Sequence, residues 1–275
     1  MRCTASLGAV GDEQTPGYYY RQVDEHTYEP TEHVQGAWLP DEQHMAPVAG
    51  LLCHALEVGS PRPDLQLARL SYEILGVMRR ATTHVEIDVV RPGRTIELVT
   101  AVMTVGDRPV VRARGWRLSR QDTSSVAGGL PDPLPDPASL AVWDGMTQWK
   151  GGYIDSLEFR VVPNGEPGRR RVWCRTDVAL LDAPASRLAE FVKLVDTANG
   201  IAARMDPTMW MFPNTDLQIH LWRTPDPVGG WVGFDTTSTI GPDGVGLTHT
   251  VLHDLAGPVG RAEQILTVRP LSARS

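Results

Sequence analysis

The chain has 275 residues, of which 41% are hydrophobic and 21% are charged, and its formal net charge is −7. This length can bury one large core or two small ones, and the composition is that of a globular protein, which excludes disordered and collagen-like chains. The acidic excess argues against a nucleic-acid partner, because proteins that bind nucleic acid non-specifically are usually basic. It does not exclude an anionic small ligand, which a local basic patch can bind.

No apolar run approaches the roughly 20 residues that a membrane-spanning helix needs, so we expect no membrane span. The N-terminus lacks the basic and apolar regions of a secretory signal. The three cysteines, Cys3, Cys53 and Cys174, are odd in number and widely spaced, which argues against a disulfide framework and a cysteine-rich zinc site. The eight histidines show no metal-ligand spacing. We therefore predict free thiols, a cytoplasmic location, and neither a metal nor a cofactor.

In chain order, residues 1–17 form a loose tail that is rich in Gly, Thr and Gln and has no periodicity. The Ala- and Leu-rich segment Met45–Val58 then predicts an apolar helix. Four runs that are typical of strands follow it, at residues 67–74, 84–90, 95–105 and 109–118.

Near the middle of the chain, residues 128–136 read Gly-Gly-Leu-Pro-Asp-Pro-Leu-Pro-Asp and are followed by Pro137. Neither a central strand nor a helix interior tolerates prolines at this density, so we expect a linker. Beyond it, residues 186–205 predict a second helix. Four more strand-like runs follow, at residues 216–222, 231–240, 246–255 and 260–268.

The two sides of the linker resemble each other. The segment His-Val-Glu-Ile-Asp-Val-Val-Arg-Pro at residues 84–92 parallels Asp-Leu-Gln-Ile-His-Leu-Trp-Arg at residues 216–223, and residues 108–113 parallel residues 257–262. Two hairpins can look alike by chance, but the matching order of the elements favours one supersecondary unit that is used twice.

We therefore predict an α+β fold, a double hotdog, in which each of two repeats is a long helix wrapped by a curved antiparallel sheet. The expected boundaries are a flexible N-terminal tail at residues 1–17, an N-terminal hotdog repeat at 18–127, a Pro/Gly-rich linker at 128–150 and a C-terminal hotdog repeat at 151–275.

Six segments together resemble the acyl-CoA thioesterase II family, and most closely its actinobacterial thioesterase-like branch. They are Gly-Ala-Trp at 36–38, Pro-Val-Ala-Gly-Leu-Leu at 47–52, Glu-Ile-Leu-Gly at 73–76, Arg-Ala-Arg-Gly-Trp-Arg-Leu at 112–118, Asp-Thr-Ala-Asn-Gly at 196–200 and Gly-Val-Gly-Leu at 244–247. Each motif is short, but their order and spacing extend over roughly residues 18–270. The resemblance implies the double-hotdog fold and a hydrolase of lipid metabolism that converts an acyl-CoA substrate to a free acid and CoA. It leaves open whether the chain forms a homo-oligomer.

The same fold can carry different activities, so the chemistry depends on individual site residues. On a helical wheel of residues 186–205, Asp196 falls at the edge of an apolar arc. The arc consists of Leu188, Phe191, Val192, Val195, Ala198, Asn199 and Ala202, and the other side carries Arg187, Glu190, Lys193 and Thr197. A carboxylate at that margin costs free energy unless it is hydrogen-bonded or used. A structural and a catalytic role are both open on this pattern, and the resemblance favours catalysis.

Gln264 is the second candidate. Period-2 alternation places it on one face of the last strand with Ala262 and Leu266, so that a neutral amide stands in an apolar row. A buried glutamine bonded to the backbone is the structural alternative. The resemblance makes Gln264 the match of the family's catalytic glutamine.

Asn214 is the third candidate and departs from the family pattern. The family has a Ser or Thr two residues before a strand-opening Asp, which here is Asp216. Asn can orient a water molecule because it offers both an acceptor and donors. A shift of one residue would make Thr215 the match instead, and a turn asparagine after Pro213 is an equally open reading.

Other side chains carry less weight. Ser186 is better explained as an N-terminal helix residue than as a nucleophile, since no Gly-x-Ser-x-Gly motif occurs. Residues 209–211, Met-Trp-Met, either line an acyl tunnel or pack in the core. Arg112, Arg114, Arg261 and residues 169–171 either meet CoA phosphates or form a solvated basic face, which we favour slightly.

The expected mechanism is direct attack of water on the thioester. Asp196 acts as general base or water-orienting carboxylate, and Asn214 and Gln264 hold the same water. Backbone amides near the start of a hotdog helix are expected to stabilise the oxyanion, although the sequence does not identify them. A single site in the C-terminal half is expected, because the repeat comparison puts Gly115 opposite Gln264 and Thr82 opposite Asn214.

Two alternatives remain open. A non-catalytic acyl-CoA- or lipid-binding double hotdog is the first, and Asn214 is the residue that supports it. A hydratase is the second, but no His follows Asp196 a few residues on along the helix.

Overall fold

The computed structural model describes residues 17–271, so Cys3 and all but the last residue of the predicted tail lie outside the described residues. The described chain forms a 14-stranded sheet that is antiparallel except at one strand pair, together with few helices. None of the helices in residues 17–271 is both long enough and apolar enough to cross a membrane.

The predicted elements of the N-terminal half are confirmed. The first helix, α1, spans Met45–Val58, and every residue from Met45 to Leu56 is buried. The four strands are β3 (Leu65–Ile74), β4 (Thr83–Arg91), β5 (Ile96–Val105) and β6 (Arg108–Ser119). Burial alternates along β5 and β6 because successive side chains of a strand point to opposite faces of the sheet.

The four strands predicted for the C-terminal half are confirmed as well. They are β12 (Asp216–Leu221), β13 (Val232–Ile240), β14 (Val245–Asp254) and β15 (Gly257–Thr267). Along β15, Ala262, Gln264 and Leu266 are buried while Glu263 and Ile265 are exposed. The inward orientation that the alternation predicted for Gln264 is therefore present.

The single helix predicted over residues 186–205 is wrong. The segment is divided into α3 (Arg187–Val192), the 3-10 turn η4 (Val195–Thr197) and α4 (Ala198–Ile201). β-Branched residues lower helix propensity, and here the Thr197 hydroxyl also donates to the carbonyl of Leu194 at 2.7 Å. Because of this turn, the faces predicted from the helical wheel are not those of the structure: Lys193 and Thr197 are buried rather than exposed.

The structure also contains elements that the sequence did not predict. The strands are β1 (Tyr18–Gln22), β2 (Thr27–Pro30), β7 (Ala141–Val142), β8 (Leu157–Val161), β9 (Arg169–Thr176), β10 (Ala179–Leu181), β11 (Trp210–Met211) and β16 (Arg269–Pro270). Most of these strands extend the large sheet, but β11 and β16 pair with each other in a separate two-stranded sheet. The helical turns are η1 (Glu32–Val34), η2 (Ser124–Val126), η3 (Pro137–Ser139), α2 (Gly152–Asp155) and η5 (Val228–Gly230).

The strand order is symmetric about its centre. It runs β10-β1-β2-β4-β5-β6-β3-β12-β15-β14-β13-β9-β8-β7, so β3 and β12 meet in the middle, with β6, β5 and β4 on one side and β15, β14 and β13 on the other. The counterpart of β12 is therefore β3 and not β4. The predicted parallel between residues 84–92 and 216–223, and with it Thr82 against Asn214, is wrong. An alternating pattern fits any strand with one buried face, so it does not identify a strand's place in the sheet.

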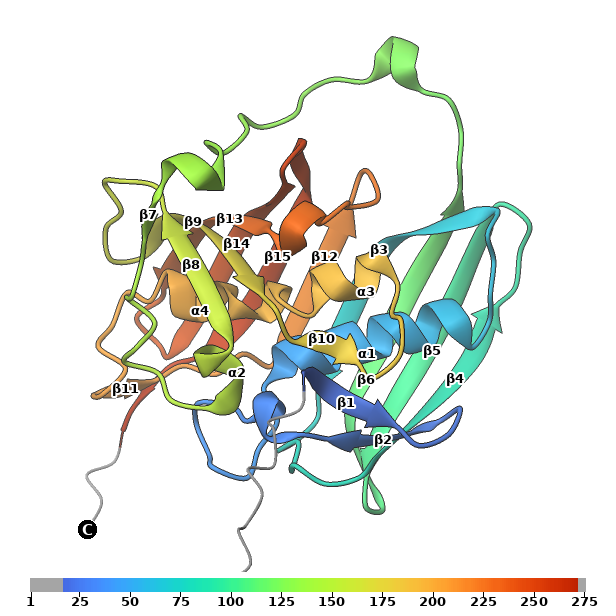
Figure 1. Cartoon of the computed structure of the whole chain (residues 1–275), viewed down its shortest axis with the longest axis horizontal. Helices are drawn as coiled ribbons and strands as arrows, with labels where there is room; N and C mark the ends of the chain where they lie inside the picture. Colours follow the sequence, from blue (N-terminus) through green and yellow to red (C-terminus); the bar gives the residue numbers. More distant parts are fainter. Residues whose placement is uncertain (1–16, 272–275) are drawn as a thin grey trace, which may run out of the picture.

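Helices α1 and α3 lie on one side of this sheet and pack beside each other (Figure 1). They are in close contact at Gly50, where an added Cβ would lie 2.7 Å from Cβ and 2.9 Å from Cα of Lys193, the residue that follows α3. Only glycine permits this backbone approach. The close approach brings the start of α1 next to η4, and the candidate site lies there.

Residues 128–136 cross over the top of the molecule without helix or strand (Figure 1). They are held by side chains of the C-terminal half: the Trp173 indole donates to the carbonyl of Pro135 at 2.7 Å.

Candidate active site

The three predicted site residues meet at one carboxylate oxygen. Asp196, in η4, is buried, and its Oδ1 accepts a hydrogen bond from Asn214 Nδ2 at 2.7 Å and from Gln264 Nε2 at 2.8 Å. Asp196 Oδ2 accepts no hydrogen bond from any other residue within 17–271. Its nearest basic neighbour is Nδ1 of His44, at 4.0 Å. One oxygen is thus fixed and the other is free to act on a ligand.

Asn214, not Thr215, takes the position before β12 that faces the carboxylate. The Thr215 side chain is exposed, whereas Asn214 is half-buried. Asn214 Nδ2 also donates to the carbonyl of Asp216 at 2.9 Å, which fixes the amide orientation. The reason is strand alternation: the two neighbours must point to opposite faces, and only one can reach Asp196.

Burial sets the acid–base behaviour of Asp196. Removal from water raises the pKa of its carboxyl to about 7, against a lowering effect of the hydrogen bonds from Asn214 and Gln264 and a small raising effect of Asp216. A carboxylate with a pKa near neutrality can both take and return a proton at physiological pH, as general base catalysis requires.

Asp196 opens onto a cavity of about 390 Å³, called here the main cavity. Its C-terminal-half walls come from Asp196, Asn199, Met211, Pro213, Asn214 and Arg269. Its N-terminal-half walls come from the loop 36–44, Met45, Ile74 and residues 76–78. The three polar residues come from the C-terminal half, but the cavity itself lies between the halves, because α1 starts beside η4.

His44 is a site residue that the sequence analysis missed. It precedes α1 as its N-cap, and its Nδ1 accepts a hydrogen bond from the Ala46 amide at 3.1 Å. Its ring stacks on Tyr153 with centroids 4.2 Å apart. Burial lowers the pKa of His44 to about 3, so the imidazole is neutral at physiological pH. The available signal was a histidine directly before an apolar helix, at a position that Ser, Thr, Asp or Asn normally occupies.

The remaining candidates lie elsewhere. Ser186 caps α3, where its Oγ accepts from the Ala189 amide at 3.0 Å and donates to Glu57, so it is a helix-capping residue as expected. Cys53 and Cys174 are free and buried, burial raises the pKa of both thiols, and neither lines the main cavity. Of residues 209–211 only Met211 reaches that cavity.

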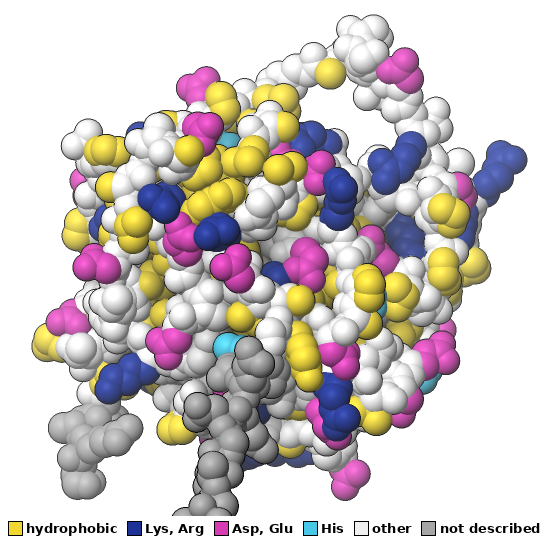
Figure 2. Space-filling view, viewed as in Figure 1, with side chains coloured by type: hydrophobic (Ala, Val, Ile, Leu, Met, Phe, Trp, Pro, Cys, Tyr) yellow, Lys and Arg dark blue, Asp and Glu magenta, His cyan; other side chains and the backbone are white. Residues whose placement is uncertain are grey.

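None of the arginines singled out for CoA phosphates lines the main cavity. Arg112 and Arg114 each lie 3.8 Å from Glu73, and Arg170 lies over the ring of Trp143. On the face seen in Figure 2, Lys and Arg side chains are interspersed with Asp and Glu rather than gathered in a patch. The arginine that does line the cavity is Arg269.

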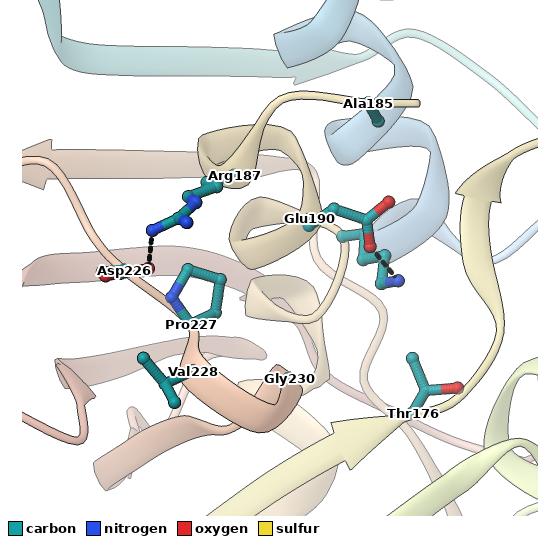
Figure 3. A pocket seen from close by; sticks show the side chains of 9 residues that line it. Thr176, Ala185, Arg187, Glu190, Asp226, Pro227, Val228 and Gly230 are labelled. Carbon is teal, nitrogen blue, oxygen red and sulfur yellow. Dashed lines mark hydrogen bonds and ion pairs between the residues drawn. The ribbon is translucent and has the colours of Figure 1, made fainter. Parts of the chain in front are cut away.

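A larger cavity, of about 520 Å³, lies beside α3 but offers no reactive group. Its charged side chains neutralise one another: Arg187 pairs with Asp226 at 2.6 Å and Lys193 pairs with Glu190 (Figure 3). Lys193 Nζ also donates to the carbonyl of Val178 at 2.7 Å. Among residues 17–271, no group of three or more His, Cys, Asp and Glu side chains is placed to hold a metal ion.

Comparison with known proteins gives two family matches that cover most of the chain. Residues 34–118 match the acyl-CoA thioesterase N-terminal domain and residues 130–268 match the acyl-CoA thioesterase C-terminal domain. No curated protein matches the sequence.

Solved structures show the same fold at low sequence identity. An acyl-CoA thioesterase II from Mycobacterium marinum is 16% identical, with a TM-score of 0.65 over 93% of this chain and 96% of that one. A tesB protein from Mycobacterium avium subsp. paratuberculosis is 15% identical, with a TM-score of 0.68 over 91% and 96%. A protein with a hot dog fold from Alicyclobacillus acidocaldarius is 14% identical, with a TM-score of 0.70 over 90% and 95%.

Proposed function

The chain belongs to the acyl-CoA thioesterase II family and is a thioester hydrolase, and from that premise we propose that it hydrolyses acyl-CoA by direct attack of a water molecule held at Asp196. The observation that supports this proposal is that the two oxygens of the Asp196 carboxylate have different surroundings. Two amides hold Asp196 Oδ1, while Oδ2 is unoccupied and the residue opens on the main cavity.

The fold in this proposal is a double hotdog. Each half contributes a helix and an antiparallel sheet that curves around it, and the two sheets join at β3 and β12. The support is the symmetric strand order, the shared side of the helices and the hot dog fold of a structural neighbour.

The reaction has two steps. Asp196 Oδ2 removes a proton from the water while the water oxygen forms a bond to the thioester carbon, giving a tetrahedral intermediate. The intermediate then collapses: the carbon–sulfur bond breaks, and the proton held on Asp196 passes to the departing CoA sulfur. Asp196 ends deprotonated, ready for another water molecule.

Asn214 and Gln264 act in this proposal as positioning residues for Asp196. Both donors are already engaged with its Oδ1, so they fix the carboxylate rather than the attacking water. This revises the shared-water role that the sequence suggested. The hydrogen bonds also keep the carboxylate ionisable near neutral pH, because each of them lowers a pKa that burial alone would raise further.

The proposal includes one site per chain. Gly115 in β6 corresponds to Gln264 in β15, since the two strands hold equivalent places in the sheet. A side chain at Gly115 would meet Leu67, Val99 and Leu56, all of them apolar. The N-terminal half therefore has no amide that could fix a buried carboxylate at this position.

The test is an assay of the purified protein against saturated acyl-CoAs of increasing chain length, with release of the free CoA thiol as the signal. We expect thiol release for at least part of the series, and one binding site per chain when a non-hydrolysable acyl-CoA analogue is titrated by calorimetry. Binding without thiol release would instead support a non-catalytic acyl-CoA carrier, and two equivalent sites would contradict the asymmetry of the halves.

A further inference from the structure

A second, very small cavity adjoins the main one. Its volume is about 20 Å³, and it is lined by Ala37, Trp38, His44, Met146, Trp149, Ile154, Thr197, Asn199 and Gly200. Four of these residues, Ala37, Trp38, His44 and Asn199, also line the main cavity. A volume of roughly 10–15 Å³ holds one water molecule, so this niche has room for a single oxygen atom.

One residue that lines the niche carries a hydrogen-bond donor without an acceptor. Trp149 is 8% exposed, and its indole Nε1 is buried without a hydrogen-bond partner among residues 17–271. The ring is fixed by edge-on contacts with Trp38 and Phe212, whose centroids lie 5.0 and 5.6 Å away. A buried N–H without a partner costs free energy, and such groups in native proteins often have a functional role.

His44 offers a second donor to the same niche. Its Nδ1 accepts the Ala46 amide proton, so the neutral ring carries its own proton on Nε2. That Nε2 has no hydrogen-bond partner within 17–271, and the atom is not completely buried. It is therefore accessible from the cavities that the ring lines. The stack on Tyr153 holds the ring plane in place.

The backbone at the start of α1 supplies few donors. The amide of Ala46 is taken by His44, and Pro47, the next residue, has no N–H. Backbone amides at a helix start were the donors that the sequence led us to expect. Here the backbone at Ala46 and Pro47 offers no free N–H to a ligand, so side chains have to supply the donors.

We propose that the niche is the oxyanion site of the reaction, in which His44 Nε2–H and Trp149 Nε1–H donate to the oxygen of the thioester carbonyl. This inference rests on the proposed function. As water attacks, the electron pair of the carbon–oxygen double bond moves to that oxygen, and the two donors stabilise the charge until the carbon–sulfur bond breaks. The niche suits an anion because His44 and Trp149 both offer donors and no carboxylate lines it.

The position relative to the base is consistent with this assignment. His44 Nδ1 lies 4.0 Å from Asp196 Oδ2, so one ring spans the distance between the base and the niche. A thioester carbon placed between them has the attacking water on one side and its carbonyl oxygen on the other. A neutral imidazole is the correct form for this task, because it can polarise a carbonyl without first losing a proton to Asp196.

Two variants of His44 separate catalysis from helix capping. His44→Asn keeps a good N-cap but is too short to reach the position of Nε2, so we expect kcat to fall about 100-fold with an unchanged melting temperature and little change in KM. His44→Gln keeps an amide donor at about the reach of Nε2 but caps poorly. It should retain kcat within about tenfold, while its melting temperature falls by about 2–4 °C. The reverse pattern, with kcat following the melting temperature, would assign His44 a purely structural role.

Trp149→Phe removes the indole N–H and keeps an aromatic ring. We expect kcat to fall about tenfold, the usual weight of one neutral hydrogen bond, with KM nearly unchanged. The matched control is Trp222→Phe, which removes an indole donor on the surface, where Trp222 Nε1 bonds to the carbonyl of Pro258. It should leave kcat unchanged.

A dithioester analogue of the substrate makes the test specific for the carbonyl oxygen. Its C=S sulfur is a weak acceptor, so the losses caused by His44→Asn and Trp149→Phe should shrink to within about threefold when both proteins are compared on the dithioester. Equal losses on both substrates, or losses that appear in KM alone, would overturn the oxyanion assignment. A variant Asp196→Asn that stays inactive in the same assay would show that the proposed function survives such a result.

Discussion

Replacing Asp196 with asparagine is expected to lower kcat at least about 100-fold and to change KM only modestly, the pattern that follows when a proton acceptor of the transition state is lost. Asparagine keeps an oxygen that can accept from Asn214 and Gln264, so the fold of η4 is retained. It loses the basic Oδ2. Steady-state thiol release by the two proteins measures the effect, and Asp243→Asn, at an exposed loop position, is the control.

The same variant should be more stable than the wild type at alkaline pH. The folded pKa of Asp196 is raised to about 7, above the ordinary value of about 4, so between these values the folded state binds a proton that the unfolded state does not. That stabilisation is complete below about pH 4 and is lost as pH rises through 7. Asparagine avoids the buried charge, and we expect a gain of about 2–4 kcal/mol in the free energy of unfolding at pH 8 and little at pH 4.

Urea unfolding at the two pH values tests this. Unchanged turnover in a folded variant would remove Asp196 from the mechanism. A variant that is inactive and also less stable at pH 8 would show that the carboxylate is structural.

Gly50→Val is expected to destabilise the protein by about 3 kcal/mol and to reduce turnover in the molecules that remain folded. The valine Cβ would lie 2.7 Å from Cβ and 2.9 Å from Cα of Lys193, so α1 and α3 must move apart. The same helix crossing sets the distance between His44 and Asp196, which links a packing defect to catalysis.

Denaturant midpoints and kcat should be compared with those of Gly128→Val, since a Cβ at Gly128 meets nothing within 4 Å. The control should match the wild type. A Gly50→Val protein that matches it too would show that the helix crossing tolerates a side chain, contrary to the geometry.

Local patterns were sufficient for most of the fold. The apolar run Met45–Val58 predicts α1, and eight strands were predicted from their patterns, β3 to β6 and β12 to β15, whereas the eight-residue strand β9 was missed. The division of the second helix was not predicted, because it depends on contacts that a helical wheel lacks: Asp196 bonds to residues 18 and 68 positions away in the chain. The parallel between residues 84–92 and 216–223 was wrong for the same kind of reason, since an alternating pattern does not identify a strand's neighbours.

For the candidate site, the sequence selected side chains better than it assigned their roles. Asp196 and Gln264 could be selected because each is a polar group in an apolar row. Burying a polar group costs free energy, so such a position indicates a specific role. The choice between Asn214 and Thr215 required the strand register, which a shift of one residue inverts. Trp149 carried no such signal, and His44 carried only that of a histidine directly before an apolar helix, because the cavity that both line is shared by segments distant in sequence.

The pH dependence of kcat/KM for thiol release tests the central claim most directly. Between pH 5 and 9 the wild type should show one ionisation, with activity rising about tenfold per unit below pH 7 and levelling off above it, as Asp196 loses its proton. His44 contributes no second ionisation to this pH profile, because its pKa of about 3 keeps the ring neutral throughout this range. The residual activity of Asp196→Asn should lack the ionisation. A flat wild-type profile, or the same ionisation in Asp196→Asn, would contradict a water molecule activated by Asp196.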